Sequence, residues 1–226
     1  EMNTRQSIIH AVIMLWIIVM PAGLFAQSKG KNLNDDNAVL LPGKKFLFKE
    51  TICTPDTQAV HYIILSVEPL PLYRQTLIRY TYYHSIDSLQ KGIVYTWEET
   101  LADDNRRWYQ IHPPRAGLNI IHELLPFPEI PLRKKTGHQW KSAIIVMDGW
   151  EKIPKNTRIV SRYQLGADTA VMIGGKKQIG RLVRARSQSK FGTGNAGFIF
   201  VDGLGFVEIE NEINGITTRM RLIEMM

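Results

Sequence analysis

The sequence has little cysteine and almost no helical patterning, and both shortages restrict its fold. Its 226 residues include one cysteine, Cys53, which excludes a disulfide framework and any zinc or iron–sulfur site with several cysteines. Apolar residues at helical spacing are scarce, and residues 119–125 are the best short helical candidate. With 44% hydrophobic and 22% charged residues, the composition is that of an ordinary globular chain, not of a disordered, collagen-like or coiled-coil one.

The N-terminal segment 1–26 has the pattern of a secretory signal peptide. Arg5 precedes an apolar run over residues 8–20, and Ala26 ends the short segment that follows. We expect cleavage after Ala26 and a mature protein in a periplasm or outside the cell. The alternative is a retained anchor, although the run is shorter than the ~20 residues that a membrane-spanning helix needs.

After cleavage, we expect a flexible leader over residues 27–40 and a single domain over residues 41–226 without a later membrane span. The Pro-rich segment 125–131 is expected to connect two halves of a sheet, because proline cannot donate a ladder hydrogen bond.

Strand signals dominate the domain and predict an all-β fold. Short runs rich in aromatic and β-branched residues recur between turn residues, without intervening helices, from residue 46 to residue 223. This spacing is typical of a curved antiparallel sheet, either a half-barrel or an open barrel or sandwich.

The C-terminal hairpin is the most specific structural prediction. Asn214-Gly215 is the preferred pair for a two-residue type I′ turn and fixes the register of the strands on either side. In this register, the residue numbers of each opposed pair sum to 429. One face of the hairpin is then apolar, and the other face carries two ion pairs, Glu210 with Arg219 and Glu208 with Arg221.

Positive charge is unevenly distributed and suggests an anionic partner. The whole chain has a formal net charge of +7, whereas residues 133–190 alone hold fourteen Lys and Arg against three acids. Four arginines fall within expected strands and are candidate ligand-binding residues: Arg158, Arg162, Arg184 and Arg186. A solvated basic face is the alternative; nucleic acid suits the charge but not the export signal.

Aromatic residues form a second group of candidates. Tyr80 and Tyr82 share one face of an expected strand, and Tyr95 and Trp97 share a face of another. Core packing is the simplest role for such residues. In a curved and incompletely closed sheet, the same rings would line an apolar cavity.

Motifs that would carry catalysis are weak in this sequence. Residues 192–197 match G-x-G-x-x-G, but a strand follows them, so a hairpin loop is expected there and not a dinucleotide site. The histidines stand alone in their segments, and His112 and His122 are the pair that a hydrolase would use. We expect no enzyme, no cofactor and no metal site.

Two short segments resemble known envelope proteins. The strand start at residues 137–140 and the closing segment 202–208, followed by the Asn-Gly hairpin, are similar to uncharacterised secreted proteins of Gram-negative envelopes. Those proteins are thought to resemble the half-barrel of periplasmic lipoprotein carriers. The resemblance covers residues 41–226 and implies a concave apolar side that binds acyl chains or a partner, although this chain lacks clear helices to plug that side.

These observations predict a secreted, non-enzymatic binding domain. Its ligand would be an apolar or anionic envelope component, such as a lipid or lipopolysaccharide, with arginines meeting headgroups and aromatic faces meeting chains. The alternatives are a structural or protein-interaction module of the envelope and, third, a hydrolase.

Overall fold

The computed structural model describes residues 39–226 except 73–74, 92–95, 105–106, 115–118 and 147–152. The expected signal peptide, its cleavage site and most of the expected leader lie outside the described residues. Within the described part of the chain, no helix is long and apolar enough to cross a membrane.

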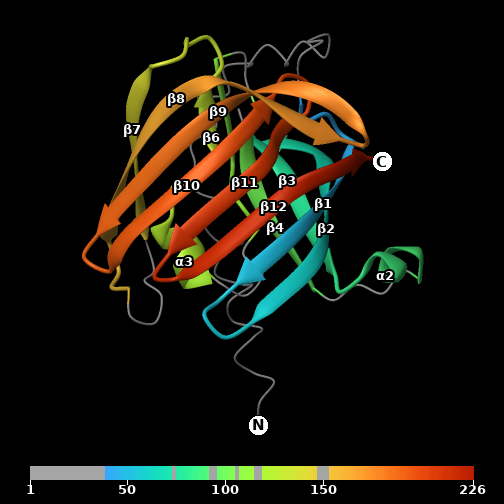
Figure 1. Ribbon diagram of the computed structural model, residues 1–226, viewed down its shortest axis with the longest axis horizontal. Helices are drawn as coiled ribbons and strands as arrows, with labels where there is room; N and C mark the ends of the chain where they lie inside the picture. Colours follow the sequence, from blue (N-terminus) through green and yellow to red (C-terminus); the bar gives the residue numbers. More distant parts are fainter. Residues whose placement is uncertain (1–38, 73–74, 92–95, 105–106, 115–118, 147–152) are drawn as a thin grey trace, which may run out of the picture. The chain divides into compact units, whose positions relative to one another are not determined.

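A single 12-stranded antiparallel sheet forms the fold (Figure 1). Its hydrogen-bonded order is β6-β5-β4-β3-β2-β1-β12-β11-β10-β9-β8-β7. The strands are β1 Lys45–Cys53, β2 Gln58–Leu72, β3 Gln75–Tyr83, β4 Thr96–Asp104, β5 Trp108–Ile111, β6 Glu129–Pro131, β7 Gln139–Val146, β8 Thr157–Ile173, β9 Lys176–Ser189, β10 Gly192–Val201, β11 Gly205–Ile213 and β12 Ile216–Met225. The prediction of an antiparallel all-β fold is confirmed.

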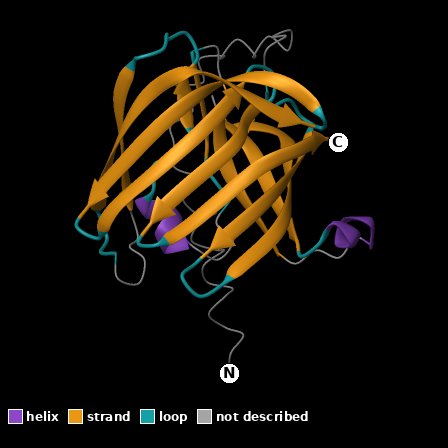
Figure 2. Cartoon of the chain, viewed as in Figure 1, coloured by secondary structure: helices purple, strands orange, loops and turns teal. Residues whose placement is uncertain are grey.

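The chain builds the sheet as two meanders. One runs from β1 to β6 and the other from β7 to β12, and pairing of β1 with β12 joins them. The Pro-rich segment supplies β6, immediately before the chain passes to the second meander. Figure 2 shows how few residues are helical: α2 covers Ile86–Lys91 and α3 covers Asn119–Leu124.

The sheet is strongly curved, so that strands far apart in its order meet across the core. Tyr109 of β5 contacts Phe200 of β10 and Phe206 of β11, with ring centroids 5.2 and 5.4 Å apart. These edge-to-face and tilted contacts join the inner faces of the two meanders. The core is therefore enclosed by one sheet folded over itself.

Alternation along the strands places the core on the inner face. In β8, for example, Ile159, Tyr163 and Leu165 are buried, whereas Arg158 and Arg162 are exposed. The inner face collects the fully buried side chains: Phe46, Ile63, Ile78, Tyr80, Tyr82, Ile111, Ile130, Phe198 and Phe206. Val39 and Leu40, expected in the flexible leader, also belong to this core.

The C-terminal hairpin has the predicted register. Ile213 lies opposite Ile216, Ile209 opposite Met220 and Glu210 opposite Arg219. Asn214 and Gly215 have φ of 51° and 78°, the left-handed conformation that a type I′ turn requires at both central positions.

The expected loop over residues 192–197 is wrong, because these residues form the first half of β10. The reason is close packing. A Cβ on Gly194 would lie 2.8 Å from Leu125 Cδ2 and 2.7 Å from Ser187 Oγ. Glycine here lets β10 approach the segment that follows α3, and Ser187 donates to the Leu124 carbonyl at 2.5 Å. The short helix, which agrees with the predicted 119–125 candidate, thus packs on the inner face of β9 and β10.

Strands β8 and β9 form a long bent hairpin. An irregularity between Leu165 and Asp168 bends β8. The hairpin tip reaches the end of β12, where the Gly174 amide donates to the Ile223 carbonyl at 3.1 Å (Figure 1).

Close approach of β9 to β10 makes Gly180 a sensitive position. A Cβ there would lie 2.5 Å from Ile199 Cγ2 and 3.1 Å from the Phe200 carbonyl oxygen. We expect Gly180→Ala to lower the free energy of unfolding by about 1–3 kcal/mol through overpacking. Urea denaturation measures this change. Gly197→Ala is the matched control, because its Cβ would meet nothing within 4 Å; an equal loss in both variants would contradict the steric explanation.

Candidate functional site

A cluster of cations lies on the outer face of β7, β8 and β9. Lys141 lies directly opposite Arg162, and Arg162 lies directly opposite Arg186. Arg184 is on the same face of β9 as Arg186 and lies opposite Gln164. All four cationic side chains are exposed. We call Lys141, Arg162, Arg184 and Arg186 the outer-face cluster.

The outer-face cluster is electrostatically unfavourable by itself. Like charges at directly opposed positions repel and destabilise a sheet. Within the described part of the chain, none of these four side chains has an acidic partner in contact. Three of them, Arg162, Arg184 and Arg186, line a shallow depression of about 280 Å³. An anion seated in this depression would relieve the repulsion.

Arg158, the fourth arginine predicted from the sequence, is exposed on the same strand face but lies opposite Ile145. It does not line the depression. Lys141 was not predicted, although its place in a strand two residues after Gln139 gives it the same outward direction as Arg162.

A larger groove of about 960 Å³ continues from the cluster across β9 to β12. Arg184 and Ala185 line both the depression and the groove. Gly197 of β10 lies opposite Arg184 of β9 on one side and Glu210 of β11 on the other. Because glycine has no side chain, the floor of the groove is open at this position. Cys53 is half-buried and also lines the groove.

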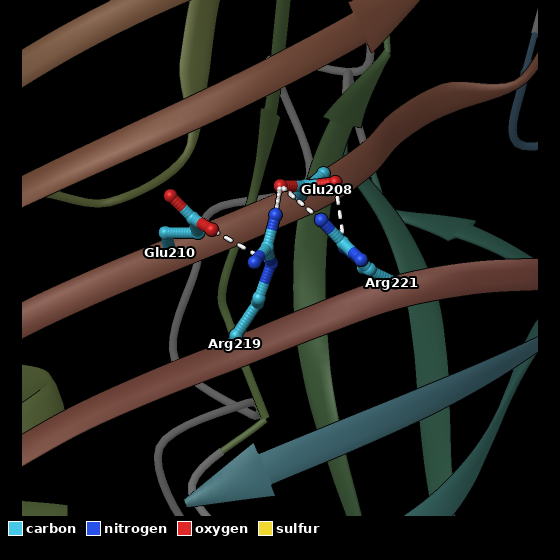
Figure 3. A network of polar contacts seen from close by, with 4 residues as sticks. All are labelled: Glu208, Glu210, Arg219 and Arg221. Carbon is cyan, nitrogen blue, oxygen red and sulfur yellow. Dashed lines mark hydrogen bonds and ion pairs between the residues drawn. The ribbon is translucent and has the colours of Figure 1, made fainter. Parts of the chain in front are cut away.

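Figure 3 shows an ion-pair network of four side chains, of which Glu210, Arg219 and Arg221 line the groove. The Arg219 guanidinium donates to Glu208 at 2.6 Å and pairs with Glu210 at 2.7 Å, while Arg221 donates to Glu208 at 2.9 Å. Both predicted cross-strand pairs are confirmed, and Arg219 in addition bridges the two carboxylates. Burial raises the pKa of Glu208, and the charge of Arg221 opposes this rise. These arginines have acidic partners, unlike those of the outer-face cluster.

The predicted aromatic candidates occupy a different place from the arginines. Tyr80 and Tyr82 are 0% and 1% exposed within the core. The Tyr80 hydroxyl donates to the His112 carbonyl at 2.8 Å. Because the sheet separates these rings from the outer-face cluster, one ligand does not touch both groups in this conformation. Tyr95 and the side chain of Trp97 lie outside the described residues.

The hydrolase candidates are partly brought together. His112 Nε2 lies 3.6 Å from Glu123 Oε1, and His122 is buried on the same short helix as Glu123. Within the described ranges, no group of three His, Cys, Asp or Glu side chains is placed to hold a metal ion.

Sequence reasoning missed a polar seam where the two ends of the sheet meet. Trp140 of β7 donates from Nε1 to Glu129 Oε1 of β6 at 2.7 Å. Its ring stacks on Tyr163 with centroids 5.0 Å apart, and the Tyr163 hydroxyl donates to the Phe127 carbonyl at 3.1 Å. We call Glu129, Trp140 and Tyr163 the seam. The strand start at residues 137–140 was noticed in the sequence, but nothing there indicated its partner.

Burial changes the ionisation of the seam. Glu129 is 1% exposed, and burial raises the pKa of its carboxyl to about 7 despite hydrogen bonds from Trp140 and Ser142. Burial also raises the pKa of the Tyr163 hydroxyl, and the charge of Glu129 adds to this rise. The seam therefore contains a carboxyl group that titrates near neutral pH.

Comparisons with known proteins give structural likenesses only. No protein-family model matches the chain, and no curated protein sequence matches it. The fold is similar to a candidate lipoprotein of Parabacteroides distasonis, with a TM-score of 0.49 and 11% identity over 83% of this chain and 96% of that one. It is also similar to a candidate exported protein of Bacteroides fragilis with a YmcC-like fold, with a TM-score of 0.45 and 9% identity over 84% and 99% of the two chains.

A third likeness is to the hypothetical lipoprotein YmcC of Escherichia coli, with a TM-score of 0.34 and 12% identity over 78% of this chain and 86% of that one. The kind of protein named by the sequence resemblance recurs among these neighbours. The three TM-scores lie below 0.5, and these likenesses carry no argument about function.

Proposed function

We propose that the protein is an exported binding domain of the cell envelope and that the outer-face cluster holds its anionic ligand. The observation that supports this is the direct opposition of Lys141, Arg162 and Arg186 without a described acidic partner. A sheet that keeps like charges in register loses stability in the free state. This loss of stability is explained if a ligand with several negative charges binds across Lys141, Arg162 and Arg186.

The geometry favours phosphate or carboxylate groups. A guanidinium presents a planar fork of donors that binds either group in bidentate fashion. One depression is lined by Arg162, Arg184 and Arg186. Neighbouring anionic groups of a lipid headgroup or an acidic glycan would therefore each bind a guanidinium group. The larger groove leaves room for the uncharged remainder of the ligand.

The N-terminal pattern supports export, and the composition of the cluster supports binding without catalysis. Arg5, the apolar run and Ala26 are typical of a signal peptide. The described residues that line the depression are arginines, glutamines, an alanine and the buried Tyr163, which offer no nucleophile paired with a base.

The test compares two charge-matched triple variants of the protein purified from the periplasm. Arg162→Gln/Arg184→Gln/Arg186→Gln removes three charges from the cluster, and Arg133→Gln/Lys134→Gln/Lys135→Gln removes three exposed charges from the turn before β7. The probes are lipopolysaccharide, which carries phosphate, and polygalacturonate, which carries carboxylate. Affinity is measured by surface plasmon resonance at low and at physiological salt, because screening weakens contacts between exposed charges.

We expect the cluster variant to lose at least thirtyfold in affinity, because hydrogen bonds to charged groups contribute about 1.5–3 kcal/mol each. The turn variant should stay within twofold of the wild type. The probe that binds more tightly identifies the source of the anion. Equal losses of affinity in both variants would show that binding depends on net charge and not on the outer-face cluster. A wild-type protein that binds neither probe would overturn the proposal in favour of an interaction module.

A further inference from the structure

Exposed apolar side chains gather at the tip of the β8–β9 hairpin and the adjoining end of β12. Met172 of β8 is 61% exposed and Ile179 of β9 is 60% exposed. The tip contacts β12 through the hydrogen bond from Gly174 to Ile223, and Met225 is exposed two residues further on. Isolated exposed apolar residues are ordinary, but exposed apolar residues that gather in one place mark an interaction surface.

The register of the hairpin directs Met172 and Ile179 to one face. Met172 lies opposite Lys177, and Ile179 lies opposite Ala170. Since opposed residues share a face of a sheet, the four side chains form one small surface of two large apolar groups, a methyl group and an ammonium. The bend between Leu165 and Asp168 carries this end of the hairpin away from the straight run of β8 (Figure 1).

Lysines border this surface. Lys177 is on the surface itself, whereas Lys176, opposite Ile173 at the start of β9, adjoins it at the turn. Lys45 accepts a hydrogen bond at its carbonyl from the Met226 amide, so that it lies beside the end of β12. All three ammonium groups are on exposed residues. The acids nearby include Glu224, opposite Leu47, Asp168, opposite Arg181 in register, and Asp202, which pairs with Arg181 at 2.7 Å. Against these three acids stand Lys45, Lys176, Lys177 and Arg181. Positive charge therefore exceeds negative charge around the apolar side chains.

We propose that the hairpin tip, defined as Met172, Lys176, Lys177 and Ile179, docks on the surface of an anionic lipid bilayer. Methionine and isoleucine can enter the boundary between headgroups and acyl chains, while flexible lysines reach back to lipid phosphates. Each lysine near such a surface contributes about 1 kcal/mol, which is roughly fivefold in affinity. The outer-face cluster differs, because its planar arginine forks suit a discrete anion whereas lysine suits a diffuse charged surface.

The test is co-sedimentation with vesicles that contain one part of phosphatidylglycerol to two parts of phosphatidylethanolamine, using protein recovered from the periplasm. Intact mass reports whether the segment 1–26 has been removed from each preparation. Met172→Ser/Ile179→Ser is compared with Ile145→Ser, which removes an apolar side chain of similar exposure, 54%, from another strand. Lys176→Gln/Lys177→Gln is compared with Lys134→Gln/Lys135→Gln in the same way.

We expect binding to fall at least tenfold in the apolar tip variant and about twentyfold in the lysine tip variant, with both controls within twofold of the wild type. Peptide mass spectrometry provides a second readout: peroxide should oxidise Met172 in solution and much more slowly on vesicles. If Met172 is oxidised equally fast in both, or if tip variants and controls bind alike, the tip does not enter the bilayer surface and the proposal is overturned.

The outer-face cluster variant separates this proposal from the proposed function. Docking by the tip should survive in Arg162→Gln/Arg184→Gln/Arg186→Gln, which leaves Met172 and both tip lysines in place. If vesicle binding is lost in that variant and kept in the tip variants, the bilayer is a ligand of the cluster and the tip has no part in docking.

Discussion

Replacing Glu129 with glutamine is expected to raise the free energy of unfolding by about 3 kcal/mol at pH 8 and to change it little at pH 4.5. The carboxyl group has a pKa of about 7 in the folded protein and 4.5 as its ordinary value, because the seam buries it. One unit of pKa difference corresponds to about 1.4 kcal/mol. The folded state holds the proton more tightly, so ionisation costs stability as the pH rises from 4.5, and that cost is complete above 7.

The glutamine side chain is neutral at every pH and keeps an oxygen that can accept from Trp140 Nε1. The variant should therefore lose the fall in stability that the wild type shows between pH 5 and 8. Urea denaturation at half-unit intervals measures both curves, and their difference removes the contribution of the histidines, including His138 beside Trp140. Parallel curves across this pH range would show that Glu129 ionises normally and that the seam is open to water.

Removing the Trp140 ring should be the most damaging single change at the seam. Trp140→Ala deletes the stack on Tyr163, the edge contact with Trp108 at 6.2 Å and the donor to Glu129. Core substitutions of Trp by Ala typically cost about 3–5 kcal/mol. We expect a loss in this range by urea denaturation at pH 8, where the carboxylate is ionised and its donor matters most.

Trp140→Phe separates packing from hydrogen bonding. It keeps a ring against Tyr163 but removes the N–H, so we expect a smaller loss of about 1–3 kcal/mol, the cost of leaving a buried acceptor without its donor. Since the hydrogen bond from Trp140 lowers the pKa of Glu129, the phenylalanine variant should also show a larger total fall in stability, extending to higher pH. A loss below about 1 kcal/mol in Trp140→Ala, well under the cost of other large core side chains replaced by alanine, would mean that backbone contacts alone hold the ends of the sheet together.

Local patterns predicted the strands well because the signal for each strand lies within a few residues. The Asn214-Gly215 pair set the register of β11 and β12, and that register placed Glu210 opposite Arg219 as observed. Outward directions of Arg162, Arg184 and Arg186 also followed from alternation alone. That these three arginines surround one depression could not be predicted in the same way. It depends on the register between β8 and β9, which the sequence of a single strand does not determine.

The failures have long-range causes. Gly192, Gly194 and Gly197 were interpreted as a loop because glycine weakens a strand locally, whereas Gly194 is needed where β10 packs against Leu125. Glu129 and Trp140 belong to opposite ends of the sheet order, and the curvature of the sheet, together with the connection from β6 to β7, brings them within hydrogen-bond distance. Tyr80 and Tyr82 shared a face as expected, but the second meander covers that face.

The pairing of β1 with β12 has a consequence for the order of folding during synthesis. Phe46 lies opposite Met225 and Phe48 opposite Leu222, so the central pair of strands joins segments from the two ends of the domain. Such a contact carries a large loop-closure cost and forms slowly. Until the last strand has emerged, each meander ends in an unpaired edge at β1 or β11. A chain with this connectivity completes its sheet only once β12 is available to pair with β1.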